Sequence, residues 1–427
     1  MKTSVIGLGK IGLPLAVQFA KKGRQVIGLD NSLNVVRLIN NGQEPFPGEF
    51  NLGNLLLEVM ENGNLSATTD VKKAVEESEN IVVCIPLVVN AEAQPEFENM
   101  DLLVLEIGKY LKKGTLISFE TTLPVGTTRS RFTAILEQES RMKVGVDFFV
   151  VFSPERVLTG RIFSDLRKYP KLVGGVTKAC TRKGVQFYET VLDFDERPDL
   201  RRANGVWHLD SCESAEFAKI AETTYRDVNI GLANEFALFA QDISVDIGEV
   251  IEASNSQPFS HIHSPGISVG GHCIPVYPQF YTWGNPNAEI VKAARRANAQ
   301  MPIAAVGQIK NKLGPIRDRS IGILGLTYRP GVKETAFTGA KVLKEELEML
   351  GARVFILDPF YSPSELTDLG YEPLTDFDKV DGLILHTAHS EFLALKHTDF
   401  PNLRFIFDGR NFFTNWSKIQ NITYLHV

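Results

Sequence analysis

Short runs of β-branched and aromatic residues alternate with longer segments of helical period over the first part of the chain. The strand-like runs are residues 3–6, 25–29, 80–86, 115–119 and 148–152. A helical segment follows the first run at residues 13–22. This alternation is typical of parallel strands joined by crossover helices. In such a sheet the ligand lies at the carboxyl ends of the strands.

Two long segments of helical period fill the middle of the chain, from about residue 210 to 242 and from about 287 to 313. Glu216, Lys219 and Thr223 are spaced i, i+3 and i+7, so they share one face of the first helix. A lysine on that face can stabilise an oxyanion, although a lysine on a long helix is more often simply solvated.

Strand-like and helical runs alternate again towards the carboxyl terminus. The segments are residues 320–326, 339–350, 353–359, 382–385 and 405–411. The predicted fold class is therefore α/β, with two doubly wound parallel-sheet (Rossmann-like) domains joined by a central helical region that contains a long helix. The predicted domains are 1–200, 201–314 and 315–427, and residues 193–210 are expected to form a loop before the long helix.

The turn after the first strand has the sequence Gly-x-Gly-x-x-Gly, and an acid ends the second strand. Gly7 allows a tight turn, Gly9 lets a pyrophosphate approach the backbone, and Gly12 lets helix and strand pack closely. Asp30 would accept hydrogen bonds from the ribose and repel a 2′-phosphate, so NAD is favoured over NADP. The expected cofactor contacts are Gly7, Gly9, Lys10, Ile11, Gly12, Asp30, Pro86 and Thr122.

Two further loops follow predicted strands of the first domain. Thr122 lies in the first loop and Glu155 in the second, and each could order a water molecule or the reacting alcohol. Their simpler interpretations are a turn hydroxyl and an acid at a helix start.

A single cysteine, Cys273, follows a Gly-Gly pair and precedes Pro275 by two positions. Glycines permit a sharp turn and proline stiffens it, so this loop is expected to present the thiol at a surface. Cys273 can then act as a nucleophile that holds an acyl group as a thioester. The alternative is a cysteine that serves as a small buried hydrophobe. His272 is more simply explained as a polar loop residue.

Composition narrows the class of protein. The 427 residues are 44% hydrophobic and 22% charged, which is ordinary for a globular enzyme. A net charge of −6 gives no electrostatic attraction for nucleic acid. No apolar run approaches the roughly 18 residues that cross a bilayer. The four cysteines are too widely spaced for a disulfide framework or a metal site, which favours a reducing cytoplasm.

Taken together, these motifs resemble those of the UDP-glucose/GDP-mannose dehydrogenase family. The resemblance rests on Thr-Thr-x-Pro-x-Gly-Thr-Thr at 121–128, Ser-Pro-Glu-Arg-Val at 153–157, Lys219, and Gly-Gly-His-Cys-Ile-Pro at 270–275. It covers nearly the whole chain in family order. Residues 224–230 and 270–276 are most similar to the branch that acts on UDP-N-acetylhexosamines, with UDP-N-acetyl-D-mannosamine as the expected substrate and UDP-N-acetylglucosamine or UDP-glucose as alternatives.

The resemblance implies a four-electron, NAD-dependent oxidation of the C6 hydroxyl through a thiohemiacetal and a thioester. It implies Cys273 as the nucleophile, Lys219 as the group that stabilises charged intermediates, and Thr122 and Glu155 as the groups that hold the water. It also implies a carboxy-terminal domain that binds UDP and central helices that form a homodimer or a higher homo-oligomer. The expected substrate contacts are Glu155, Arg156, Lys219, Arg226, Gly270, Arg329, Lys333 and Arg410.

Three positions depart from the family pattern. Thr223 stands where the family usually has asparagine, Tyr277 where it has aspartate, and Ala336 where it has arginine. Lys333 is the nearest replacement for that arginine. Two other functions stay open at this stage, a two-electron alcohol dehydrogenase in which Cys273 is dispensable, and a nucleotide-sugar-binding protein without turnover.

Overall fold

The structure is a computed structural model that describes residues 2–427. The described chain divides into two compact units. Unit 1 comprises Met1–Glu222 and Gln279–Gly284, and unit 2 comprises Thr223–Pro278 and Asn285–Val427. The chain therefore passes from unit 1 to unit 2 within the long helix, enters unit 1 again within a short helix, and returns to unit 2 after Gly284.

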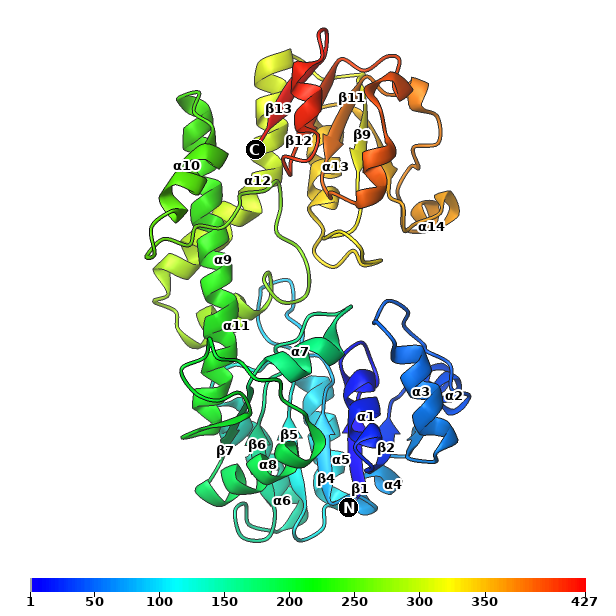
Figure 1. The fold of residues 1–427 in the computed structure, drawn as a ribbon, viewed down its shortest axis with the longest axis vertical. Coiled ribbons are helices and arrows are strands. Elements are labelled where there is room, and N and C mark those ends of the chain that lie inside the picture. The colour runs from blue at the N-terminus through cyan, green and yellow to red at the C-terminus, as the bar shows by residue number, and fades with distance from the viewer. Residues whose placement is uncertain (1) are drawn as a thin grey trace. The chain divides into compact units, whose positions relative to one another are not determined.

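Among the described residues, unit 1 contains one eight-stranded sheet in the order β3-β2-β1-β4-β5-β6-β7-β8 (Figure 1). The strands are β1 (Lys2–Ile6), β2 (Gln25–Leu29), β3 (Leu65–Thr68), β4 (Asn80–Val83), β5 (Leu116–Phe119), β6 (Phe149–Phe152), β7 (Lys171–Gly175) and β8 (Val206–Leu209). All neighbours are parallel except β6 and β7, which are antiparallel.

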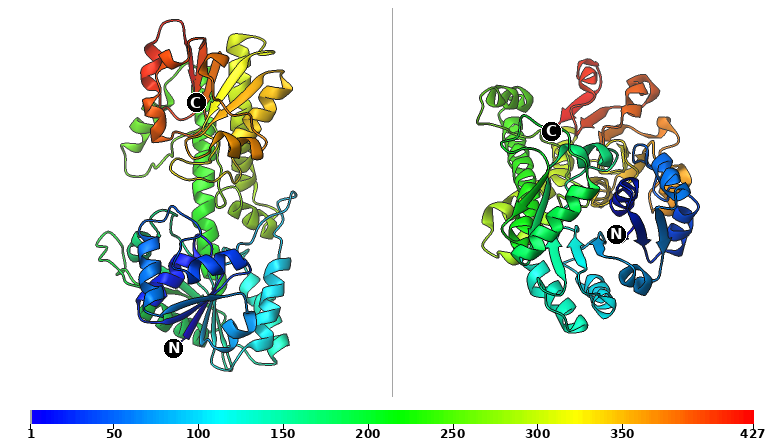
Figure 2. Two further views of the ribbon diagram at one scale, coloured as in Figure 1. Left: turned by 90° about the vertical axis from the view of Figure 1, so that its right-hand side faces the viewer. Right: turned by 60° about the horizontal axis from the view of Figure 1, so that its bottom comes forward.

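Helices cover both faces of this sheet (Figure 2). They are α1 (Gly12–Lys21), α2 (Leu33–Asn40), α3 (Leu52–Glu61), α4 (Val71–Glu76), α5 (Glu98–Tyr110), the π-helical turn η1 (Thr128–Thr133), α6 (Ala134–Ser140), α7 (Ile162–Lys168) and α8 (Lys178–Val191). Aromatic side chains pack between these helices: Phe19 of α1 meets Phe187 of α8 with ring centroids 5.6 Å apart. Burial of such large side chains is the main contribution to the stability of this packing.

The strand ends of unit 1 are aligned by register. Ile6, Val83, Phe119 and Phe152 are partners across β1, β4, β5 and β6, so the loops that follow these strands emerge side by side. One detail of the sequence-based picture is wrong. Residues 193–210 are not loop throughout, because Val206–Leu209 forms β8 at the sheet edge beside β7.

Unit 2 has a five-stranded parallel sheet in the order β10-β9-β11-β12-β13. Its strands are β9 (Ser320–Leu324), β10 (Arg353–Leu357), β11 (Gly382–Leu385), β12 (Phe405–Asp408) and β13 (Thr423–His426). Its helices are α9 (Cys212–Asp242, which begins in unit 1), α10 (Ile247–Asn255), α11 (Tyr277–Gly284, which ends in unit 1), α12 (Glu289–Leu313), α13 (Gly339–Met349) and α14 (Pro363–Asp368). The 3₁₀ turns are η2 (Phe377–Lys379), η3 (Ser390–Ala394), η4 (His397–Asp399) and η5 (Thr414–Lys418). The predicted α/β class with a long central helix is confirmed.

Candidate active site

The turn between β1 and α1 is built for close packing. Gly7 has φ +88° and its N–H donates to the Leu29 carbonyl at 2.8 Å. A Cβ on Gly12 would lie 1.8 Å from the Gly7 carbonyl oxygen, so only glycine fits there. A Cβ on Gly9 would meet no protein atom within 4 Å. The space above Gly9 is thus open at the amino end of α1, as dinucleotide binding requires.

Asp30 is held rigidly at the end of β2. Its Oδ2 accepts a hydrogen bond from the Leu8 N–H at 2.9 Å, and its Oδ1 accepts from the Ser32 N–H at 2.9 Å. Each oxygen keeps a second lone pair for a ribose hydroxyl. Lys10 and Pro86 are exposed and Ile11 is half-buried beside this turn.

The loop after β5 is anchored by α9. The Glu216 carboxylate accepts hydrogen bonds from the Gly126 N–H at 2.6 Å, the Thr128 N–H at 2.8 Å and the Thr128 hydroxyl at 2.6 Å. Glu216 is fully buried, and Thr122 in the same loop is 4% exposed. The long helix therefore fixes the conformation of the loop that carries Thr122.

Replacing Glu216 with alanine is expected to lower the free energy of unfolding by about 3 kcal/mol, because three donors, two of them buried, lose their acceptor. Urea denaturation followed by circular dichroism measures this. Glu213→Ala is the matched control on the same helix, since its carboxylate pairs with the exposed Arg129 and should cost less than about 1 kcal/mol. Equal losses for the two variants would contradict the anchoring role.

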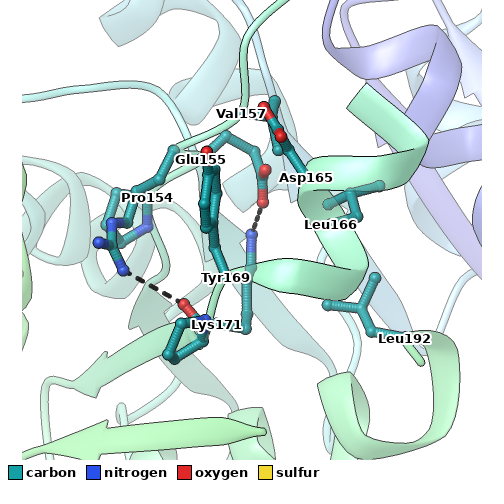
Figure 3. A pocket seen from close by; sticks show the side chains of 10 residues that line it. Pro154, Glu155, Val157, Asp165, Leu166, Tyr169, Lys171 and Leu192 are labelled. Atoms are coloured by element: carbon teal, nitrogen blue, oxygen red, sulfur yellow. Dashed lines mark hydrogen bonds and ion pairs between the residues drawn. The ribbon is translucent and has the colours of Figure 1, made fainter. Parts of the chain in front are cut away.

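The loop after β6 carries Glu155, which points at the Lys171 ammonium (Figure 3). The Glu155 side chain is 8% exposed and that of Lys171 is 4% exposed. Both line a cavity of about 10 Å³, which is room for about one water molecule. Glu155 is therefore a fixed carboxylate at a strand end beside a single small void.

Lys171 bridges two carboxylates. Its Nζ also donates to Glu120 Oε2 at 2.5 Å, and Glu120 Oε1 accepts from the Tyr188 hydroxyl at 2.6 Å. The Tyr188 and Ser118 hydroxyls share a further hydrogen bond of 2.6 Å. Burial raises the pKa of Glu120 to about 8, against the lowering effect of Lys171. Burial also raises the pKa of Tyr188 well above its usual range.

The other expected substrate contacts of unit 1 lie on α9 and the β6 loop. Lys219 is half-buried one turn after Glu216. Arg156 donates from Nε to Glu222 at 2.9 Å and from a terminal nitrogen to the Pro170 carbonyl at 3.4 Å.

In unit 2, the chain before α11 presents Cys273. Gly271 has φ +96° and donates its N–H to the Ala336 carbonyl at 2.8 Å. A Cβ on Gly270 would lie 2.7 Å from the Tyr328 side chain and 2.8 Å from the Phe337 carbonyl. The Tyr277 N–H donates to the Cys273 carbonyl at 2.9 Å. Cys273 itself is exposed, so the expectation of a presented thiol is confirmed.

Four basic residues of unit 2 were expected at the substrate. Arg410 donates from Nε to the His386 carbonyl at 2.9 Å and from Nη2 to the Ser268 carbonyl at 3.1 Å. Burial lowers the pKa of Arg410 to about 10. Lys333 is ion-paired with Glu365, and Arg329 donates to the Tyr328 hydroxyl at 3.2 Å. Arg226 is exposed on α9.

Three family models match consecutive parts of the chain, all from one family. The NAD binding domain matches residues 1–192, the central domain 213–310 and the UDP binding domain 322–415. The chain belongs to the UDP-glucose/GDP-mannose dehydrogenase family. As a member of this family it is an NAD-dependent nucleotide-sugar dehydrogenase, and the open glycine turn and the oriented Asp30 described above fit the cofactor.

Individual members of the family match over nearly their whole length. The UDP-N-acetyl-D-mannosamine dehydrogenase of Pyrococcus horikoshii is 31% identical over 420 residues, 96% of each chain. That of Methanococcus aeolicus is 32% identical over 94% of this chain and 88% of its own. Among solved structures, a UDP-D-ManNAc dehydrogenase from Pyrococcus horikoshii has a TM-score of 0.90 at 29% identity, covering 100% of this chain and 99% of that one.

The three positions at which the sequence was expected to depart from the family pattern have defined places in the structure. Thr223 is buried on α9, and Tyr277 is the first residue of α11. Ala336 supplies the carbonyl that fixes Gly271. No group of three or more His, Cys, Asp or Glu side chains among residues 2–427 could hold a metal ion, and no helix in that range is long and apolar enough to cross a membrane.

Sequence reasoning missed Lys171, Glu120 and Tyr188 in this dehydrogenase. The run Lys171–Gly175 is strand-like, and a lysine that opens a buried strand is unusual enough to have drawn notice. Glu120 directly follows the buried strand β5. What brings these residues together is strand pairing, which the local sequence does not reveal.

Proposed function

We propose that this dehydrogenase oxidises the C6 hydroxyl of UDP-N-acetyl-D-mannosamine to the uronate in two NAD-dependent steps. The observation that carries the proposal is an exposed cysteine on a rigid glycine turn, in a chain that matches UDP-N-acetyl-D-mannosamine dehydrogenases along nearly its full length. The solved structure of a UDP-N-acetyl-mannosamine dehydrogenase from Staphylococcus aureus has a TM-score of 0.85 at 29% identity, over 100% of this chain and 98% of its own.

Cys273 is the nucleophile in this scheme. Bound NAD⁺ supplies a hydride acceptor for each of the two oxidations. After the first oxidation, the Cys273 thiolate adds to the C6 aldehyde carbon and the carbonyl oxygen takes up a proton, which gives a thiohemiacetal. Loss of a second hydride and of the hydroxyl proton leaves a thioester. Water then adds to the carbonyl carbon, the carbon–sulfur bond breaks, and the thiolate and the uronate separate.

Lys219, Thr122 and Glu155 support this chemistry. The Lys219 ammonium stabilises the oxyanion of the intermediates, because a fixed positive charge acts strongly where water is excluded. Thr122 and Glu155 hold the attacking water, with Glu155 as its base.

The uridine diphosphate is bound by the carboxy-terminal part of unit 2. Arg329, Lys333 and Arg410 are the cations that contact phosphate, and Gly270 lets the substrate approach the backbone. Arg156 and Arg226 are the remaining basic residues in contact with the substrate. For this assignment, the Lys333 ammonium must leave its ion pair with Glu365 and bind phosphate instead.

The test supplies NAD⁺ with UDP-N-acetyl-D-mannosamine, UDP-N-acetylglucosamine or UDP-glucose, and counts NADH per sugar. We expect two NADH per molecule of UDP-N-acetyl-D-mannosamine and a kcat/KM at least about 10-fold higher than for the other two. One NADH per sugar would contradict the thioester route. A preference for another sugar would correct the substrate, and tight binding without NADH would remove the catalytic assignment.

We also propose that the protein forms a homodimer or a higher homo-oligomer through α9. Phe236, Phe239 and Ile243 follow one another at i, i+3 and i+7 near the end of this helix and are all exposed. A cluster of large exposed apolar side chains marks an interaction surface.

Phe239→Asp is accordingly expected to give a monomer in light scattering coupled to gel filtration, because the carboxylate would have to be buried in the interface. Leu393→Asp is the control, since Leu393 is similarly exposed but lies far along the chain in η3. An unchanged mass for Phe239→Asp would rule out this surface.

A further inference from the structure

In unit 1, a lysine is buried between two carboxylates at the place where the parallel strands of the sheet end. In the antiparallel pair, Phe152 of β6 is opposite Gly174 of β7. Continuing that register by three residues brings Lys171 opposite Glu155. The antiparallel direction of β7 is therefore what places its first residue at the carboxyl ends of the parallel strands, where Glu120 follows β5.

We propose roles for two residues of this cluster. Lys171 is a positioning residue that holds the Glu155 carboxylate in place and balances its negative charge. Glu120 is a buried acid that exchanges a proton with Glu155 through the Lys171 ammonium. This inference rests on the proposed role of Glu155 as the base for the attacking water. It adds two residues to the reaction that neither the sequence motifs nor the family comparisons assign.

The charges of the cluster support this role. One ammonium faces two carboxyl groups, and both carboxyl groups are almost inaccessible to water, at 1% and 8% exposure. Two ionised carboxylates would leave an uncompensated negative charge in the interior, which is costly. Below the Glu120 pKa of about 8, protonated Glu120 leaves Lys171 to balance Glu155 alone; above it, Glu120 is ionised and can accept a proton.

The groups around Glu120 come from four elements. Lys171 belongs to β7, Glu155 to the β6 loop and Tyr188 to α8. Cys84 follows β4, and burial together with Glu120 raises its pKa well above the usual range, so this thiol stays neutral. Lys171 is also 4.8 Å from the centre of the Tyr188 ring. Proton exchange is thus confined to the two carboxyl groups and the amine between them.

The proton route balances. With Glu120 ionised, Glu155 takes a proton from the attacking water and passes it to Lys171 while the ammonium gives another of its protons to Glu120. The Glu155 O–H bond and one Lys171 N–H bond break as a new Lys171 N–H bond and a Glu120 O–H bond form. Lys171 stays an ammonium throughout, in keeping with its pKa, which burial lowers but the two carboxylates raise above its usual value. The net change is one proton moved from water to Glu120, which later returns it to the product side or to solvent.

The experiment compares the pH dependence of kcat for uronate formation in the wild type, Glu120→Gln, Lys171→Arg and Lys171→Met. Glu189→Gln is the control, because Glu189 is exposed on α8 next to Tyr188. We expect the wild type and the control to show an ionisation near pH 8 with rising kcat, and Glu120→Gln to lack it. Lys171→Met should lose about 100-fold in kcat with KM little changed, and Lys171→Arg should recover part of that loss.

A second measurement does not need turnover. Infrared difference spectra of the wild type should show a protonated carboxyl band that titrates near pH 8 and is missing in Glu120→Gln. If the wild type makes no uronate but shows this band, the proposed function is wrong, whereas the assignment of Glu120 as a buried acid still holds. If uronate forms and Glu120→Gln keeps the wild-type pH profile, or Lys171→Met keeps the wild-type kcat, the relay is overturned.

Discussion

Replacing Cys273 with alanine is expected to lower uronate formation by at least about 1,000-fold and to leave at most one NADH per sugar, because the first oxidation precedes the attack of the thiolate. The physical reason is that the second oxidation needs a carbon that carries both sulfur and oxygen, and the aldehyde alone does not provide it. Uronate is quantified by chromatography and NADH by absorbance, with UDP-N-acetyl-D-mannosamine as substrate.

Cys180→Ala is the matched control for this substitution. Cys180 is buried in the first turn of α8 and touches Thr177, outside the proposed site. It should keep the wild-type rate within about 2-fold. NAD binding by Cys273→Ala should be unchanged, because the glycine turn belongs to unit 1. Two NADH per sugar from Cys273→Ala would reject the thioester.

Gly12→Ala is expected to lower the free energy of unfolding by about 3 kcal/mol or more and to abolish NAD binding. The new Cβ would lie 1.8 Å from the Gly7 carbonyl oxygen, and this atom belongs to backbone that is fixed by β1 and β2. The amino end of α1 must therefore move away from the turn. Thermal denaturation and NADH fluorescence titration measure the two losses.

Gly9→Ala separates packing from cofactor binding in the same turn. Its Cβ would meet no protein atom within 4 Å, so stability should stay within about 0.5 kcal/mol of the wild type. Its methyl group would occupy the space where the pyrophosphate approaches the backbone, so NAD affinity should fall at least about 10-fold. Normal NAD binding by Gly9→Ala would mean that the pyrophosphate lies elsewhere.

Local pattern was sufficient for the features that depend on neighbours in the sequence. The alternation of strands and helices predicted a doubly wound sheet in each unit, but not the antiparallel β7, because hydrophobic period is a property of each segment alone. The Gly7–Gly12 turn and Asp30 predicted the NAD domain for the same reason. The exposure of Cys273 also followed from its own glycines, since backbone freedom at Gly270 and Gly271 is local.

Only the tertiary structure decided which distant side chains share a site. Glu216 accepts from a loop 88 to 90 residues earlier, and Lys171 lies between carboxylates 51 and 16 residues away. The antiparallel direction of β7 brings Lys171 to the two carboxylates. No residue in β7 signals this direction. Strand pairing is set by burial across the whole sheet, so the composition of any single strand leaves it undetermined.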